Sequence, residues 1–558
     1  MKDWFGNLYA DIGGRKGLVR LLLITALACS LLVLDLYSGL ESPDSVNING
    51  LVGLVLLPGL VYGLSLSCFS LILPRSVCRI VFSVILGWVF FFAIADLMAR
   101  EQFGVIIQRT CTIMILVGSS WEEISNFVRS YPQIHLILLL GIILIVGLAK
   151  CTYFDAQHGR RRLFRLFLLG QLPLVIWLFI SPGHGQTFAQ RMRGCSILQF
   201  PSVSFWYFAS CELSTFKDMT HASVNPDLPS RLDCRTNKDS PLLAVIVIGE
   251  SATRNRWSLY GYERKTNPYL DSRKSSLCVF SDLVAPNHMT TGCLRYFLST
   301  ATKEDEGCRY LLPSVCKRAG YECSLLSNQP HWGRNDGTEV VLFSACDRRI
   351  WLEDTFGQWS RDKHRYDSLL LPYIQCEVVS TKGNKVLIVH PAGSHFEYDD
   401  RYPVESAVFG LDANGKMKPD ITRADHYDNS TVYSDYILNE IIKQLELRGG
   451  DSLLLYLSDH GESPRGGKNR FVQDRDVWEI PMFAWFSDGY RAHYPDVVES
   501  MYKAREKPLV SDQLLFGVTR LLRIEGVPGY TEGADFLSDA FVPRKKRYED
   551  FVNLDEKR

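Results

Sequence analysis

The sequence has no net charge, because 61 lysines and arginines balance 61 aspartates and glutamates over 558 residues. Without a basic excess, it shows no electrostatic footprint of nucleic-acid binding. It also lacks an internal repeat, a low-complexity segment and a repeated Cys-x-x-Cys pair. The missing Cys-x-x-Cys pairs argue against a zinc ribbon. The chain is too long for one ordinary domain, and its two halves differ in composition.

Long apolar runs dominate the first 182 residues. A helix that crosses a bilayer core needs about 20 mainly apolar residues. The second and third runs meet that length, whereas the fourth needs its flanks. Buried helices of a soluble protein are the alternative for any one run, but five in succession predict a transmembrane domain of five helices over residues 1–182. The runs cover about 18–34, 51–73, 77–98, 134–148 and 163–180.

Basic residues set the expected orientation of this membrane domain. Cytoplasmic loops are enriched in lysine and arginine. The chain concentrates these residues before the first run, after the second and before the fifth. We therefore expect a cytoplasmic N-terminus and, after five crossings, an external location for everything beyond residue 180. The basic residues are Lys2, Arg15, Lys16, Arg20, Arg75, Arg79, Lys150, Arg160, Arg161, Arg162 and Arg165.

Residues 183–240 form the expected interfacial linker between the two halves. An aromatic cluster at 205–208 lies close to the predicted membrane exit. Aromatic rings favour the boundary between lipid and water, and ordinary core packing is the alternative. We expect this linker to lie along the outer leaflet and to tether the following domain to it.

Ten cysteines follow residue 180, on the side where disulfides form. An even number in an oxidising compartment favours disulfide bonds, although the irregular spacing leaves the pairing undetermined. Short loops make Cys278–Cys293 and Cys308–Cys316 plausible local bridges.

Residues 241–558 alternate short apolar runs with helical patterns. This alternation is typical of a parallel sheet flanked by helices. The run 242–248 is apolar on both faces, as a central strand should be. The sequence thus predicts a C-terminal α/β domain with a central, mainly parallel sheet.

Three of these runs end in acidic or histidine side chains. Glu250 follows the run 242–248, His390 and then His395 follow 386–389, and Asp459-His460 follows 453–457. In open α/β sheets, ligands bind at the carboxyl ends of the strands. Carboxylate and imidazole groups that meet there suit a catalytic divalent metal, most naturally zinc.

Each of these residues also has a structural interpretation. Glu250 can cap the start of a helix. His390 fits a structural histidine better than a direct ligand, because it leaves the strand before the turn. His395 lies in a Gly-Ser-His loop and is the better functional candidate.

A nucleophile is expected in the loop 285–294, which leads into a predicted helix at 294–299. Thr290 and Thr291 lie in this loop, and a helix cap is the simpler role for either. A helix N-terminus also offers backbone N–H groups to a phosphate, and zinc would lower the pKa of a threonine hydroxyl.

The motifs together resemble the bacterial phosphoethanolamine transferases of the alkaline phosphatase and sulfatase superfamily. The resemblance covers nearly the whole chain, including the order of the motifs and the five spans. The matching text is Ile248-Gly249-Glu250-Ser251, Ser258-Leu259-Tyr260-Gly261-Tyr262, Thr266-Asn267-Pro268, 286–294, Leu326-Ser327-Asn328-Gln329, Gly393-Ser394-His395, Tyr427-Asp428-Asn429-Ser430 and Ser458-Asp459-His460-Gly461-Glu462.

The resemblance implies a role for each matching position. Glu250, Asp459 and His460 become zinc ligands, and Thr290, favoured over Thr291 by its register, becomes the nucleophile and fourth ligand. His395 would bind the phosphoryl group, hold a second zinc or move a proton. The expected substrate-binding positions are Asn328, Gln329 and His390.

The resemblance also implies a reaction and a place. The enzyme would be a monomer of the bacterial inner membrane with a periplasmic catalytic domain. It would transfer phosphoethanolamine from phosphatidylethanolamine to a lipopolysaccharide acceptor, either a core sugar or lipid A, through phospho-Thr290. The motif text resembles the branch that modifies the lipopolysaccharide core.

Departures and alternatives remain. Residues 465–470 lack the further histidine of the lipid A-modifying relatives, which puts a second zinc in doubt. A phosphoglycerol transferase of the same superfamily is the closest alternative, and a non-catalytic membrane sensor is the alternative from another class. The Cys/Ser-x-Pro-x-Arg signature of sulfatases is absent.

Overall fold

The computed structural model describes residues 216–224, 227–329, 338–356, 365–395, 397–464 and 474–544, together with Val77, Ile80 and Val84. The chain divides into two compact units, residues 1–213 and 214–558. Among the described residues, no helix has the length and hydropathy needed to cross a membrane. The five expected spans and the linker up to residue 215 lie outside the described residues, except that Val77, Ile80 and Val84 are helical.

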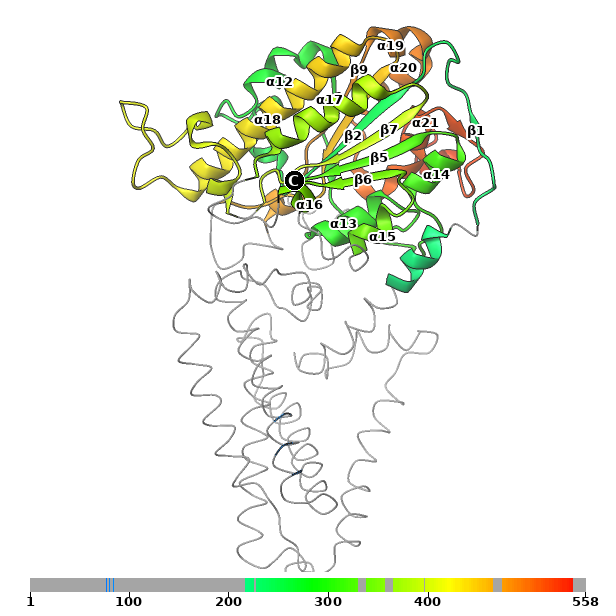
Figure 1. The fold of residues 1–558 in the computed structure, drawn as a ribbon, viewed down its shortest axis with the longest axis horizontal. Helices are drawn as coiled ribbons and strands as arrows, with labels where there is room; N and C mark the ends of the chain where they lie inside the picture. Colours follow the sequence, from blue (N-terminus) through cyan, green and yellow to red (C-terminus); the bar gives the residue numbers. More distant parts are fainter. Residues whose placement is uncertain are drawn as a thin grey trace, which may run out of the picture. The chain divides into compact units, whose positions relative to one another are not determined.

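A seven-stranded sheet organises the second unit, with the strand order β3-β9-β8-β2-β7-β5-β6 (Figure 1). Only β9 runs against its neighbours β8 and β3 among these strands, so the sheet is mainly parallel, as expected. The strands are β2 (Leu243–Gly249), β3 (Leu277–Phe280), β5 (Glu322–Ser327), β6 (Arg348–Trp351), β7 (Lys385–His390), β8 (Ser452–Ser458) and β9 (Met482–Phe486). Two small sheets pair β1 (Asp233–Cys234) with β11 (Ile524–Glu525) and β4 (Leu283–Val284) with β10 (Leu509–Val510).

Successive side chains of β2 point alternately into two hydrophobic cores, one on each face of the sheet. Ala244, Ile246 and Ile248 belong to one core, and Leu243, Val245 and Val247 to the other. This happens because successive side chains of a strand point to opposite faces of the sheet. Both faces of β2 are therefore covered, which explains why its sequence is continuously apolar.

Helices cover both faces of the sheet. Figure 1 shows α17 and α18 along the sheet. Buried apolar residues of α17 and α18 complete one core, and those of α13, α14, α20 and α21 complete the other. The α-helices are α12 (Pro268–Ser272), α13 (Thr290–Phe297), α14 (Leu312–Arg318), α15 (Thr338–Leu342), α16 (Leu352–Phe356), α17 (Leu370–Ser380), α18 (Arg423–Arg448), α19 (Asp488–His493), α20 (Pro495–Ala504) and α21 (Leu515–Leu521).

The predicted strands are confirmed with small shifts of their ends, because β2, β7 and β8 cover the runs 242–248, 386–389 and 453–457. β2 lies between β8 and β7, and its registers place Gly249 beside Ser458 and Val247 beside Val389. The carboxyl ends of the three strands therefore meet at one edge of the sheet.

The two local disulfides that short loops made plausible are not formed in this structure. Cys278, Cys293, Cys308 and Cys316 are free thiols in this structure. The Cys293 thiol instead donates to the Asn287 carbonyl (3.0 Å), within the turn that starts α13. The shortest described approach of two thiols is between Cys323 and Cys346, whose Sγ atoms are 3.2 Å apart in the core.

Candidate active site

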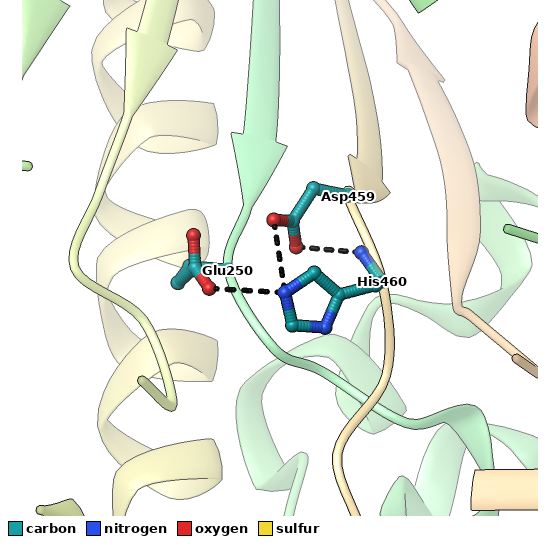
Figure 2. A group of neighbouring side chains, drawn as sticks. All are labelled: Glu250, Asp459 and His460. Carbon is teal, nitrogen blue, oxygen red and sulfur yellow. Dashed lines mark hydrogen bonds and ion pairs between the residues drawn. The ribbon is translucent and has the colours of Figure 1, made fainter. Parts of the chain in front are cut away.

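Glu250, Asp459 and His460 form one cluster at the carboxyl ends of β2 and β8 (Figure 2). One ligand-type atom from each lies within 4.8 Å of the others, and all three residues are buried. His460 Nε2 is 3.6 Å from Glu250 Oε1 and 3.5 Å from Asp459 Oδ2. The Asp459 amide also donates to the Gly249 carbonyl (2.9 Å), which ties the end of β8 to the end of β2.

A sharp turn after β2 directs Glu250 into this cluster. Ser251 has a φ of 56°, an unfavourable value for a residue with a side chain. The Tyr427 hydroxyl donates to the Ser251 carbonyl (2.8 Å), and the Ser251 hydroxyl donates to Glu250 Oε1 (2.7 Å). Strain of this kind persists where surrounding contacts hold it, and it concentrates at functional sites.

The ring of His460 is oriented by its own backbone neighbour. His460 Nδ1 lies 2.8 Å from the Gly461 carbonyl, which only accepts hydrogen bonds. The proton of the neutral ring is therefore assigned to Nδ1, and the Nε2 lone pair faces Glu250 and Asp459. A carbonyl that fixes the tautomer of a histidine in this way is characteristic of metal-binding histidines.

Asp459 presents one engaged and one free oxygen. Its Oδ1 accepts from the amides of His460 (2.6 Å) and Ser251 (3.0 Å). Its Oδ2 is buried and has no hydrogen-bond partner among the described residues. A buried carboxylate oxygen without a donor is costly unless a cation or another donor satisfies it. The donor set of two carboxylates and one imidazole nitrogen fits zinc.

Thr290 lies against this cluster at the start of α13. Its hydroxyl is 3.3 and 3.2 Å from the two carboxylate oxygens of Glu250 and 3.4 Å from His460 Nε2. The helix begins at Thr290 and ends at Phe297, four residues earlier at its start than the predicted 294–299. The neighbouring Thr291 hydroxyl is buried without a described hydrogen-bond partner.

Asn287 builds the turn that sets the start of α13. Its side-chain oxygen accepts from the amides of His288 (2.7 Å) and Met289 (3.1 Å). A Cβ at Gly292 would lie 2.5 Å from the Asn287 amide nitrogen. The small residue therefore lets the turn close against the helix and carries Thr290 to the cluster.

Gln329 contacts the cluster, whereas Asn328 does not reach it. The Gln329 side-chain amide donates to Glu250 Oε2 (3.2 Å) and to the Pro391 carbonyl (2.8 Å). The Asn328 side chain donates to Asp367 Oδ1 and to the Arg365 carbonyl, both at 2.8 Å. Both residues are buried.

His390 and His395 occupy different environments. His390 is fully buried, with Nε2 3.9 Å from Glu250 Oε2, and burial lowers its pKa to about 4, so the ring is neutral near pH 7. His395 is partly exposed, and its carbonyl accepts from Arg401 Nε (3.2 Å). Among the described residues, the cluster with metal-binding geometry contains neither His390 nor His395.

Residues 243–517 match the family model described as Sulfatase. They form a Sulfatase-family domain. The matched segment includes every residue of the cluster and every strand of the central sheet.

Relatives confirm the resemblance to phosphoethanolamine transferases. Phosphoethanolamine transferase EptC of Escherichia coli O18:K1:H7 (strain RS218 / NMEC) is 28% identical over 326 residues, which are 55% of each chain. The chain thus matches about half the length of this curated relative. The periplasmic domain of the E. coli EptC, solved in complex with Zn, is 26% identical with a TM-score of 0.50, over 57% of this chain and 92% of that one.

The integral membrane protein lipooligosaccharide phosphoethanolamine transferase A (EptA) from Neisseria meningitidis is similar in fold over a longer stretch. It aligns with 92% of this chain and 98% of its own, with a TM-score of 0.66 and 20% identity.

Within the Sulfatase-family domain, Arg256, Tyr262 and Arg264 make structural contacts that the sequence does not reveal. Arg256 Nε and Nη2 donate to the two oxygens of Asp428 on α18 (2.8 and 3.0 Å). Arg264 and Tyr262 also donate to Asp428, which is fully buried. Burial works against the charged form of Arg256, yet the contacts with Asp428 raise its pKa. Because Tyr427 precedes Asp428, this network also holds the hydroxyl that braces Ser251.

Glu462 is buried close in sequence to His460 and is a further acidic group of this domain. The segment 465–470, where the sequence lacks the relatives' histidine, lies outside the described residues. The described residues contain one group with metal-binding geometry, formed by Glu250, Asp459 and His460.

Proposed function

We propose that this protein transfers phosphoethanolamine from phosphatidylethanolamine to a lipopolysaccharide acceptor through a phospho-Thr290 intermediate. The observation that carries the proposal is the position of the Thr290 hydroxyl, 3.2–3.4 Å from Glu250 and His460. A hydroxyl at that distance from a metal-type cluster is placed as an activated nucleophile. The phosphoethanolamine transferases among its relatives supply the reaction class.

Glu250, Asp459, His460 and Thr290 would hold a zinc ion. When bound, zinc would lower the pKa of the threonine hydroxyl and offset negative charge on the phosphodiester. The free Oδ2 of Asp459 and the directed Nε2 of His460 support this ligand set. The Zn complex of the E. coli periplasmic domain supports the choice of metal.

The Thr290 oxygen attacks phosphorus in line. A Thr290 Oγ–P bond forms, the bond from phosphorus to the diacylglycerol oxygen breaks, and the threonine proton leaves with diacylglycerol. An acceptor oxygen then attacks the phosphothreonine, the Oγ–P bond breaks, and a proton returns to Thr290. Such transfer depends mainly on positioning and on stabilisation of charge.

The other site residues receive supporting roles. His395 takes the proton of the acceptor, since it is partly exposed and follows Ser394, whose amide donates to the Glu250 carbonyl. Gln329 fixes one oxygen of Glu250 and leaves the other toward His460. Asn328 and His390 are buried. They therefore support substrate binding by holding the residues around them.

The proposed location is the bacterial inner membrane, with residues 1–182 as the membrane domain, 183–240 as the linker and 241–558 as the periplasmic domain of a monomer. The five apolar runs and the fold similarity to an integral membrane protein support this arrangement. A membrane anchor would keep the site beside a lipid donor and a lipid-linked acceptor, and so raise their effective concentration.

Expression of the full chain in a host without such transferases tests the proposal. Mass spectra of the envelope glycolipids should gain phosphoethanolamine, on lipid A or on the core. Thr290→Ala should lower this gain by more than about a thousandfold, while Thr291→Ala, the matched neighbour, should retain most of it. A glycolipid that gains phosphoglycerol would establish the alternative donor, and full activity of Thr290→Ala would refute the nucleophile.

A further inference from the structure

Asp367 joins two strand ends beside the metal-type cluster, although no motif of the sequence includes it. It is 4% exposed and begins the short 3-10 helix η8 (Asp367–Leu369) before α17. Its Oδ1 accepts from the Asn328 side chain after β5 (2.8 Å) and from the Ala392 amide after β7 (2.8 Å). Its Oδ2 accepts from the Gly393 amide (2.9 Å).

The segment that Asp367 holds after β7 presses directly on Glu250. Gly393 has a φ of +54°, and a Cβ there would lie 2.8 Å from the Glu250 carbonyl oxygen and 3.0 Å from Glu250 Cβ. The next amide, Ser394 N, donates to that carbonyl (3.0 Å). Asp367 therefore fixes the surface against which the backbone of Glu250 rests.

The segment that Asp367 holds after β5 controls the Glu250 carboxylate. Asn328 is bound to Asp367, and the adjacent Gln329 donates to Glu250 Oε2 (3.2 Å). Gln329 also donates to the Pro391 carbonyl (2.8 Å), so the two segments are bound to each other as well. One buried carboxylate thus underlies both the backbone and the side-chain position of Glu250.

Only a carboxylate satisfies these donors. Three N–H groups point at Asp367, and an asparagine has one acceptor oxygen, so its own NH₂ would face one of them. Burial raises the pKa of Asp367, and the three donors oppose that shift. A buried acid kept at this cost, whose carboxylate accepts from the loops after β5 and β7, is placed to support the site.

We infer that Asp367 is a positioning residue that holds Glu250 in the geometry needed to bind the metal ion. This inference rests on the proposed function. In the proposed mechanism, Asp367 contacts neither the substrate nor the metal ion. Outer-shell groups of this kind commonly change metal affinity or activity by about 10–100-fold.

The test compares Asp367→Asn with the wild type and with Asp435→Asn in the full-length protein. Asp435 is a matched control, because it is also buried and accepts two backbone N–H bonds, but from Tyr269 and Leu270 of α12. Zinc affinity is measured by competition with a chromogenic chelator, folding by thermal unfolding without metal, and transfer over a range of zinc concentrations.

Asp367→Asn should weaken zinc binding about 10–100-fold, with activity that recovers as zinc is raised. Asp435→Asn should lower the unfolding temperature but leave zinc affinity unchanged. Wild-type zinc affinity in Asp367→Asn would overturn the inference and leave the proposed function standing. An equal loss of zinc affinity in both variants would reduce Asp367 to a general stabilising residue and also overturn it. A wild type that binds no zinc would overturn both the inference and the proposed zinc site.

Discussion

At the scale of single residues, the two carboxylate oxygens of Asp459 have different roles. Oδ1 is occupied by two backbone amides, whereas Oδ2 has no described hydrogen-bond partner and lies 3.5 Å from His460 Nε2. A substitution that changes only Oδ2 should therefore remove a metal ligand and keep the hydrogen bonds from the Ser251 and His460 amides to Oδ1.

Asp459→Asn is that substitution, since an asparagine oxygen can keep both amide bonds while its NH₂ replaces Oδ2. We expect zinc affinity to fall by more than the roughly 10–100-fold typical of an outer-shell group, with an unfolding temperature near that of metal-free wild type. Equilibrium dialysis with elemental analysis measures the loss. Unchanged zinc content in this variant would remove Asp459 from the ligand set.

The sequence predicted that Glu250, Asp459 and His460 would meet, but it also expected His390 or His395 in the same group, and the cluster contains neither of these two. Glu250, Asp459 and His460 each follow an apolar run, and parallel strands bring their carboxyl ends together. The sequence was not sufficient to predict Asp367, which follows no strand and lies in no motif. The support that Asn328 gives to the site was equally hidden, because it depends on a partner 39 residues away.

At the scale of elements, residues 256–264 are bound to α18 through two carboxylates, Asp425 and the fully buried Asp428. Asp428 receives donors from Arg256, Tyr262 and Arg264. Removing one partner of a buried ion pair leaves an uncompensated charge and typically costs about 3–5 kcal/mol.

Asp428→Asn should therefore lower the free energy of unfolding by about 3–5 kcal/mol. Glu440→Gln, which breaks the exposed pair with Lys443 on the same helix, should cost less than about 1 kcal/mol. Urea unfolding of the metal-free protein measures both. Comparable losses of unfolding free energy in the two variants would show that the buried pairs of Asp428 stabilise the fold no more than an exposed pair does.

The cysteines show where spacing along the chain misleads. Short loops favoured Cys278–Cys293 and Cys308–Cys316, yet all four are free thiols, and Cys278 and Cys293 lie on β3 and α13. Cys323 on β5 and Cys346 before β6 lie 23 residues apart in sequence, and their sulfur atoms are 3.2 Å apart. Hydrogen bonds between Asp347 and Cys323 already align the two segments.

We predict that Cys323 and Cys346 form a disulfide when the protein is exposed to oxidised glutathione, which is reduced to two thiols as the protein pair is oxidised. Peptide mapping without reduction should find this bridge, while Cys278 and Cys293 remain open to alkylation after unfolding. A Cys278–Cys293 bridge in the map would contradict the arrangement of these elements.

At the scale of the whole molecule, the chain combines a Sulfatase-family domain with five apolar runs. The start of α13 at Thr290 instead of 294 shows how the fold refined the prediction, because the Asn287 turn begins the helix before its apolar pattern does. The prediction of a membrane domain rests on the length and hydropathy of the five runs alone, because they lie outside the described residues apart from Val77, Ile80 and Val84.

Residues 214–558 expressed alone should fold and bind zinc, as the isolated E. coli periplasmic domain does in its Zn complex. Transfer from phosphatidylethanolamine in vesicles should fall by at least about a hundredfold relative to the full chain, because the tether is lost. Both forms should act equally on a short-chain, water-soluble donor. Equal transfer from vesicles would show that the first unit does not present the site to lipid.

The most direct test of the central claim is to find the covalent intermediate. Purified full-length protein is incubated with zinc and phosphatidylethanolamine in detergent without acceptor, quenched in acid, digested and mapped by tandem mass spectrometry. The proposed mechanism predicts one phosphoethanolamine group on Thr290, with release of diacylglycerol, and its disappearance when acceptor is added before the quench. A modified Thr291, or diacylglycerol release without any modified residue, would contradict it.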